Sequence, residues 1–172
     1  MSANDSAFWR FSLRFYARPD VAPLCLALQD QHGVDVNLLF FILFLSLQQR
    51  LLTPADVRRI DQAAAGWRTR AVLPLRALRR DLKNAVAPMD MAATEALRTE
   101  IKRCELQAER MQQEMLERTF PAATTGVDSA VKKAAAANIA AYGAALGSRS
   151  RGTLPADVVE TLLQLFYDEF AL

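Results

Sequence analysis

The longest hydrophobic stretch of the chain lies in residues 35–52, where apolar side chains occur on every side of an expected helix. Asp35 stands at its start and is a typical N-cap residue. A helix without a polar face must be enclosed by protein or by lipid. Asn37 and Ser46 interrupt the stretch, and it is shorter than the roughly 20 apolar residues that a bilayer requires. We therefore expect this segment to be the central helix of a soluble bundle.

Capping residues and helical periodicity predict further helices before and after this stretch. Ser6 is placed to cap an aromatic helix, and Asp20 a second helix that ends at Gly33. Together with the central helix, the second helix is expected to form a tight antiparallel hairpin over residues 20–52. Thr53 precedes a proline and starts a fourth helix, which Pro74 must end or kink.

The second half of the chain repeats these signals. Asp90 is expected to start the longest helix, which ends near Thr119. Residues 122–147 are rich in alanine, and Asp128 is the expected cap of a helix there. Thr153 and Pro155 begin a last helix, which carries acidic residues and an apolar stripe.

These patterns predict an all-α fold, because no segment alternates between polar and apolar residues as a half-buried strand does. We expect one helical domain over residues 1–172, a bundle of about six or seven helices around the central apolar helix. Residues 8–86 form its aromatic and apolar core half. Residues 90–172 add the long amphipathic helix and the alanine-rich and acidic C-terminal helices.

Composition narrows the classes of function. The net charge of the 172 residues is +2, so the molecule as a whole favours neither nucleic acid nor an acidic membrane. Cys25 and Cys104 are too few for a disulfide framework and suit a reducing compartment. The N-terminal residues lack the basic and apolar regions of a secretory signal. We expect a cytoplasmic protein without a transmembrane segment.

One stripe on the longest helix has heptad spacing, which is typical of a helix packed along a narrow seam. It is a candidate interface for a second copy or a protein partner. The alternative is that it packs within its own chain, because it lasts fewer than the three or four heptads that independent coiled coils sustain. The stripe consists of Leu97, Ile101, Cys104, Ala108, Met111 and Met115.

Residues 54–86 hold eight Lys or Arg residues against three Asp. Phosphates or anionic lipids are the partners that such an excess favours. The alternative, which we prefer, is that these charges are solvated or are balanced within the chain, for example by the acidic last helix, since nucleic-acid binders usually carry a basic domain-wide charge. The candidate anion-binding residues are Arg68, Arg70, Arg76, Arg79, Arg80 and Lys83.

A third candidate site is a pocket between the aromatic first helix and the apolar third helix, because helix bundles can hold small apolar or amphipathic ligands. Its candidate residues are Phe8, Trp9, Tyr16, Asn37 and Phe41. Asn37 is a polar group that burial penalises unless it finds partners. Closing the helix N-terminus is the interpretation we prefer for it, over contact with an anionic ligand group.

Motifs for catalysis are absent from the sequence. Asp30, His32 and Asp35 cluster in one turn, but their spacing matches no metal-ligand signature, and Asp35 is already explained as a cap. Neither cysteine has a second one nearby. Serine-hydrolase, P-loop and dinucleotide-binding patterns do not occur. We expect no catalytic residue, metal or cofactor, and an enzyme is the least favoured class.

Several short segments of the N-terminal third resemble the sequences of a proteobacterial family that is catalogued only as a domain of unknown function. They are residues 8–13, Tyr16, Pro19, residues 25–30 and residues 33–40, within a resemblance that covers residues 8–47. The resemblance implies a bacterial cytosolic protein. It brings no activity, cofactor or catalytic residue.

Three functions follow from these sites. The leading hypothesis is a non-enzymatic protein that acts by association, with itself or a protein partner, through the long helix and the acidic last helix. The alternative is binding of a small apolar or amphipathic ligand in the interhelical pocket. Anion or nucleic-acid binding by the arginine-rich segment is a weaker hypothesis.

Overall fold

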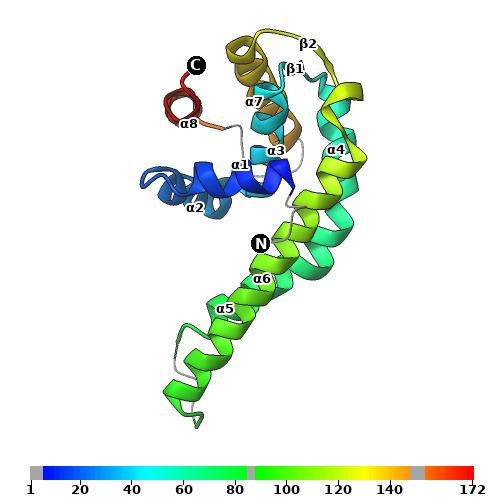
Figure 1. The fold of residues 1–172 in the computed structure, drawn as a ribbon. Helices are drawn as coiled ribbons and strands as arrows, with labels where there is room; N and C mark the ends of the chain where they lie inside the picture. The colour runs from blue at the N-terminus through cyan, green and yellow to red at the C-terminus, as the bar shows by residue number, and fades with distance from the viewer. Residues whose placement is uncertain (1–5, 85–87, 148–153) are drawn as a thin grey trace.

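The fold is a body of short helices from which one long helical hairpin projects (Figure 1). The computed structural model describes residues 6–84, 88–147 and 154–172. The body contains α1 (Ala7–Tyr16), α2 (Val21–His32), α3 (Val36–Leu47), α7 (Val131–Gly147) and α8 (Ala156–Phe170). The hairpin is formed by α4 (Pro54–Trp67), a π-helical turn (Arg68–Val72), α5 (Leu73–Asp81) and the long α6 (Met91–Thr119).

Helix α3 is the centre of the body, as its sequence predicts. Every residue from 37 to 46 is buried, and α1, α6 and α7 pack around the helix. Asp35 caps it, since its Oδ1 accepts a hydrogen bond of 3.2 Å from the backbone N–H of Leu38. Burying a leucine or phenylalanine side chain contributes roughly 1.5–3 kcal/mol, so this helix supplies much of the free energy that holds the body together.

The second helix takes a different place from the one expected. Gly33 has the left-handed φ of 66° that ends α2, as predicted. However, α2 and α3 do not form a tight antiparallel pair: α3 packs chiefly against α7, whereas α2 contacts α1 and α8. Local turn residues predicted the change of direction, but the apolar surface of α3 is shared among helices from distant parts of the chain.

The sequence predicts that Pro74 ends or kinks the helix; instead, a π-helical turn interrupts the α-helical pattern before Pro74, and the helical rod does not end there. Proline has no N–H and cannot continue the i→i−4 pattern of hydrogen bonds. The N–H of Leu73 bonds to the carbonyl of Arg68, five residues back, and the chain then continues as α5. Helices α4 and α5 therefore run on as one rod beside α6 (Figure 1).

A pair of very short strands contacts α3 and α7. β1 (Arg50–Leu51) pairs antiparallel with β2 (Val127–Asp128), with Arg50 opposite Asp128. The cap expected at Asp128 is therefore wrong, because this residue belongs to β2 and α7 begins at Val131. Apart from this pair, the described elements are helical, and the all-α prediction is confirmed.

The last helix packs against the first. Phe166 of α8 is buried, and its ring lies 6.1 Å from that of Phe15. Glu169 pairs with Arg14 at 2.7 Å and with Arg18 at 3.5 Å. Pro155 precedes α8 as predicted, whereas Thr153 lies outside the described residues. Among the described helices, none has both the length and the apolar character needed to cross a bilayer.

Candidate functional site

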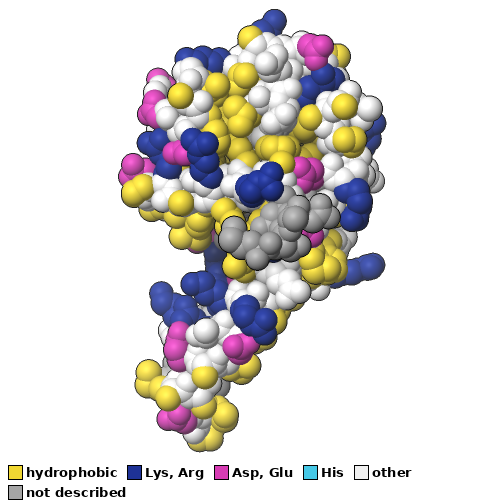
Figure 2. All heavy atoms as spheres, in the orientation of Figure 1, with side chains coloured by type: hydrophobic (Ala, Val, Ile, Leu, Met, Phe, Trp, Pro, Cys, Tyr) yellow, Lys and Arg dark blue, Asp and Glu magenta, His cyan; other side chains and the backbone are white. Residues whose placement is uncertain are grey.

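A pocket of about 400 Å³ lies where the hairpin joins the body. Helices α1, α2 and α3 form its body side, and α5 and α6 form its hairpin side. The outline of the molecule is notched at this junction, where hydrophobic and basic side chains meet (Figure 2). We call this cavity the junction pocket.

The rim of the junction pocket is apolar. Leu13 and Tyr16 of α1, Leu26 of α2 and Leu106 of α6 all line it, and each is among the large hydrophobic side chains that are exposed. Trp9 lines the pocket one turn before Leu13. Trp9, Leu13 and Tyr16 recur at helical spacing on α1, so one face of this helix is turned towards the pocket.

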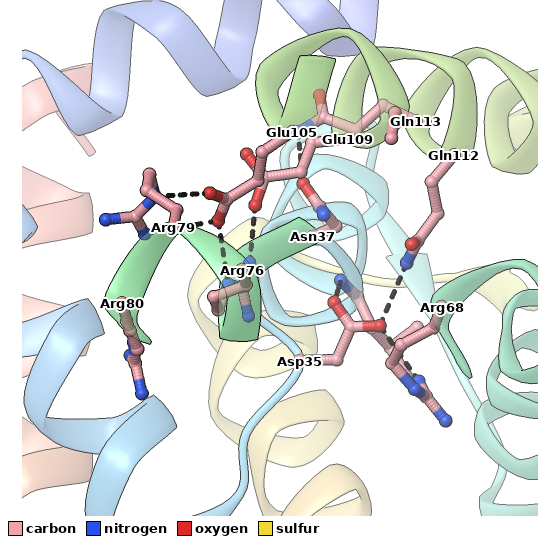
Figure 3. Close-up of polar contacts among 12 residues, drawn as sticks. Asp35, Asn37, Arg68, Arg76, Arg79, Arg80, Glu105, Glu109, Gln112 and Gln113 are labelled. Atoms are coloured by element: carbon pink, nitrogen blue, oxygen red, sulfur yellow. Dashed lines mark hydrogen bonds and ion pairs between the residues drawn. The ribbon is translucent and has the colours of Figure 1, made fainter. Parts of the chain in front are cut away.

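The hairpin side of the pocket carries a cluster of opposite charges (Figure 3). Arg76 donates to Glu105 at 2.9 Å and also to Glu109, and Arg79 donates to Glu105. For Glu105, burial acts to raise the pKa, but the hydrogen bonds from Arg79 and Arg76 outweigh it, and the pKa is lowered. Burial raises the pKa of Glu109, despite its contact with Arg76.

The inner end of the pocket holds three polar side chains without charge, which we call the amide end: Ser12, Asn37 and Gln113. Nε2 of Gln113 donates to Oδ1 of Asn37 at 2.7 Å. Oε1 of Gln113 and Oγ of Ser12 are buried and have no hydrogen-bond partner in the described parts of the chain. Buried polar groups are rarely left unpaired, and each costs about 1–3 kcal/mol.

A second polar cluster lies beside the pocket, at the start of the π-helical turn (Figure 3). Oδ2 of Asp35 accepts from Arg68 at 2.8 Å and from Gln112 at 2.9 Å, and Arg68 also donates to Asp61 at 2.9 Å. Asp35 thus joins α3 to both arms of the hairpin as well as capping its own helix. π-Helical turns occur frequently near functional sites.

The pocket-lining groups do not favour nucleophilic catalysis. Cys25 lines the pocket, but burial raises the pKa of its thiol to about 12, so the reactive thiolate is scarce at neutral pH. Burial raises the pKa of Glu109, but its carboxylate is already held by Arg76. Within residues 6–84, 88–147 and 154–172, no group of His, Cys, Asp and Glu side chains is arranged to hold a metal ion.

The structure separates the five residues expected to form a ligand pocket. Trp9, Tyr16 and Asn37 line the junction pocket. Phe8 and Phe41 lie in the core instead, with their rings 5.0 Å apart. Asn37 does not cap α3, since it is buried and accepts from Gln113; the interpretation as a cap is wrong.

The heptad stripe of α6 does not lie on one surface. Ile101 and Ala108 are buried in the contact with the rest of the chain, and Met115 packs on the core. Leu97, Cys104 and Met111 are exposed. An interface on α6 would therefore have to use the exposed members alone.

Four of the six candidate anion-binding residues are paired with carboxylates of their own chain. Arg68, Arg76 and Arg79 form the pairs given above, and Arg80 pairs with Asp30. Arg70 and Lys83 have no ion pair in the part of the chain that the structure describes. The balancing carboxylates lie on α2, α3, α4 and α6, and not on the acidic α8, whose Glu169 pairs with α1.

The turn between α2 and α3 does not bring its acidic residues together. Asp30 pairs with Arg80, whereas Asp35 pairs with Arg68. The two carboxylates of this turn thus hold different parts of the hairpin, which is a structural role.

Sequence reasoning missed the polar residues of α6 that line or flank the pocket. Glu105 and Gln112 occupy buried positions in register with Ile101, Ala108 and Leu116. Polar residues within an otherwise apolar helical stripe are the signal that could have found them, because burial without partners is costly. Gln113 lies directly beside this stripe.

Comparison with known proteins places the chain in a family without giving it an activity. Residues 7–116 match the family described as "Protein of unknown function (DUF2390)". No curated protein and no solved structure matches the chain. Every residue that lines the junction pocket lies within the matched segment. Because the match covers more than half of the chain, the protein belongs to this family of unknown function.

Proposed function

We propose that this protein binds a small amphipathic molecule in the junction pocket. The observation that carries the proposal is the pairing of an apolar rim with an inner end where Gln113 Oε1 and Ser12 Oγ have no partner among the described residues. A ligand with an apolar part and a hydrogen-bonding group would cover the first and satisfy the second.

The apolar rim supports the proposal because exposing apolar side chains to water is unfavourable. Leu13, Tyr16, Leu26 and Leu106 come from three helices yet surround one opening, and each keeps 41–50% of its surface exposed. Contiguous exposed apolar surface marks binding sites more often than it marks ordinary surface. The volume of about 400 Å³ is within the range typical of small-molecule sites.

A fluorescence titration with N-phenyl-1-naphthylamine tests the proposal. We expect saturable binding to the wild-type protein, and a loss of affinity of about tenfold or more in Leu106→Glu, which places a charge on the apolar rim. Leu73→Glu is the matched control, because Leu73 is similarly exposed on the hairpin but does not line the pocket.

The titration has two outcomes that contradict the proposal. One is the absence of saturable binding to the wild-type protein. The other is an equal loss in Leu106→Glu and Leu73→Glu, which would place the dye on the general apolar surface. Native mass spectrometry of protein purified from its own cells adds a direct search for a retained small molecule.

Association was the leading hypothesis from the sequence, through the long helix and the acidic last helix; as a second candidate function we propose association through the far end of the hairpin instead. One observation favours it: Leu78 of α5, Met91 and Leu97 of α6, and Met89 between these helices are exposed. The hairpin that α5 and α6 form projects beyond the body (Figure 1). Methionine side chains adapt readily to a partner surface. The partner would be a second copy of the chain or another protein.

Binding of anions by the arginine-rich segment receives less support. Its paired arginines would have to leave carboxylates buried or half-buried if they turned to a phosphate, and breaking such a pair is costly. Only Arg70 and Lys83 of the candidate set are without an ion pair in the described residues, and two exposed cations make a weak nucleic-acid site.

A cytoplasmic location also remains a proposal. Cys25 and Cys104 are both free, and Cys104 is exposed. An exposed free thiol suits a reducing compartment. Fractionation of cells followed by immunoblotting would test the location, and recovery outside the cytoplasm would contradict it.

A further inference from the structure

We infer that the junction pocket selects a ligand whose inner end is an uncharged group that both donates and accepts hydrogen bonds, such as a carboxamide. This inference rests on the proposed function and specifies the chemical class of the ligand. It is carried by the unequal use of the polar atoms at the amide end, Ser12, Asn37 and Gln113.

The two side-chain amides of this end are joined by one hydrogen bond only. Nε2 of Gln113 donates to Oδ1 of Asn37, so each amide uses a single one of its two ends. Oε1 of Gln113 is left as an acceptor, and the hydroxyl of Ser12, which can donate or accept, is likewise without a partner among the described residues. A carboxamide on a ligand offers the matching N–H donor and C=O acceptor.

The polar side chains of the amide end are buried, but the terminal amide of Gln113 can still rotate. Ser12 and Gln113 are each only 4% exposed, and neither Ser12 Oγ nor Gln113 Oε1 has a hydrogen-bond partner among the described residues. The terminal torsion of glutamine is soft, and its amide can turn towards a ligand at small cost. A ligand that hydrogen-bonds to a buried unpaired group removes part of the cost of burying that group.

Charge argues for a neutral inner end. No ionised group belongs to the amide end, and the nearby Arg76 is already held by Glu105 and Glu109. An ionised ligand group brought to the amide end would lose its hydration without gaining an opposite charge. Lys102 lines the pocket further along α6 and has no ion pair among the described residues, so an anionic ligand would be drawn towards Lys102 instead.

Three matched probes test the inference: 2-naphthamide, 2-naphthoate and 2-methylnaphthalene, which share one ring system and differ in the attached group. Dissociation constants come from titrations followed by ligand or protein fluorescence. We expect 2-naphthamide to bind about tenfold more tightly than 2-methylnaphthalene, the factor that one additional hydrogen bond to a buried group supplies. It should also bind more tightly than 2-naphthoate.

Two variants connect any preference to the amide end. Gln113→Met keeps the length of the side chain but removes both polar atoms, so within this variant the ratio of the dissociation constants of 2-methylnaphthalene and 2-naphthamide should fall to about one. Ser12→Ala removes only an unpaired hydroxyl, so this variant should fold like the wild type and lose part of the preference. Circular dichroism will check that both variants are folded.

The outcomes separate this inference from the proposed function. Equal binding of all three probes, in a protein that binds N-phenyl-1-naphthylamine at the pocket, would leave the binding function standing and overturn the inference. Tightest binding of 2-naphthoate, lost in Lys102→Met, would also overturn it by assigning an anionic ligand. Failure of every probe, N-phenyl-1-naphthylamine included, would overturn both.

Discussion

Gln113 on α6 donates a 2.7 Å hydrogen bond to Asn37 on α3, and so ties the hairpin to the central helix across 76 positions of sequence. Both residues line the junction pocket. The same contact therefore helps to hold the hairpin on the body and forms part of the pocket wall. The remaining amide atoms of the two residues are those that we assign to a ligand.

Glycine is required at one position of the chain and is dispensable at another. Gly126 has a φ of 74°, and a Cβ there would lie 2.4 Å from the carbonyl oxygen of Leu51. We expect Gly126→Ala to lower the free energy of unfolding by more than about 2 kcal/mol, through backbone strain and this overlap. Chemical denaturation followed by circular dichroism measures the change.

Gly66→Ala is the matched control for this prediction. Gly66 lies within α4, and nothing is found within 4 Å of the Cβ that alanine would add. The substitution should raise the free energy of unfolding by about 0.5–1 kcal/mol, because glycine is a poor helix former. Equal effects at both positions would contradict the conformational argument.

Asn138 holds α7 to the segment that follows α3. Its Oδ1 accepts from the backbone N–H of Leu52 at 2.7 Å, and its Nδ2 donates to Ser46 Oγ at 2.9 Å and to the carbonyl of Arg50 at 2.8 Å. Asn138→Ala leaves these buried groups unpaired and should lower the free energy of unfolding by about 3 kcal/mol.

The control for Asn138 is an exposed amide of the same kind of helix. Nε2 of Gln164 donates to Oδ1 of Asp168 at 2.7 Å on the exposed surface of α8. Gln164→Ala should change the free energy of unfolding by less than about 0.5 kcal/mol. A loss at Asn138 no larger than that at Gln164 would show that the buried contacts carry little stability.

The charge cluster of the hairpin predicts a dependence of stability on pH. The pKa of Glu105 is lower in the folded protein than its ordinary value, so the stability it contributes is present above roughly pH 4.3 and is lost as pH falls through the folded pKa. Glu105→Gln should cost about 2 kcal/mol at pH 7, since hydrogen bonds to charged groups are strong. Thermal unfolding from pH 3 to 7 measures the difference, which should shrink towards acid pH.

Glu100→Gln provides the comparison for Glu105, because Glu100 pairs with Arg103 while both side chains are largely exposed. Its effect on the free energy of unfolding should stay below about 1 kcal/mol at every pH.

The pKa of Glu109 is raised by burial, so the pH dependence of its contribution to stability is opposite to that of Glu105: the contribution is present at low pH and is lost as pH rises through the folded pKa. A difference between wild type and Glu105→Gln that persists at pH 3 would refute the assignment.

Association through the hairpin is tested at Leu97, which is 54% exposed. Ile101 is unsuitable, because it is buried and a charge there would disrupt the hairpin itself. If the hairpin end joins two copies, size-exclusion chromatography with light scattering will show a dimer that Leu97→Glu converts to a monomer with unchanged helical content. Val127→Glu, exposed on the body, should leave the dimer intact.

A monomeric wild-type protein at high concentration would exclude self-association through this surface. A pull-down that compares the wild type with Leu97→Glu would then ask for a different partner. Enrichment of the same proteins by both would count against the hairpin end as an interface.

The sequence by itself determined the helices and most of their ends. Ser6, Asp35, Thr53 and Asp90 each accept the hydrogen bond expected of an N-cap, because capping depends on residues only three positions apart. The enclosure of the apolar helix α3 was likewise predictable, since a helix without a polar face has to be buried.

Tertiary structure alone decided how these helices meet. Asn37 finds Gln113 and Asp35 finds Arg68 through contacts 76 and 33 positions apart, which no local pattern encodes. The same holds for the arginine-rich segment, whose partners come from neighbouring helices and not from the acidic α8. Hydrophobic periodicity sets which face of a helix is buried, but the partner of a buried polar group depends on the geometry of the whole chain.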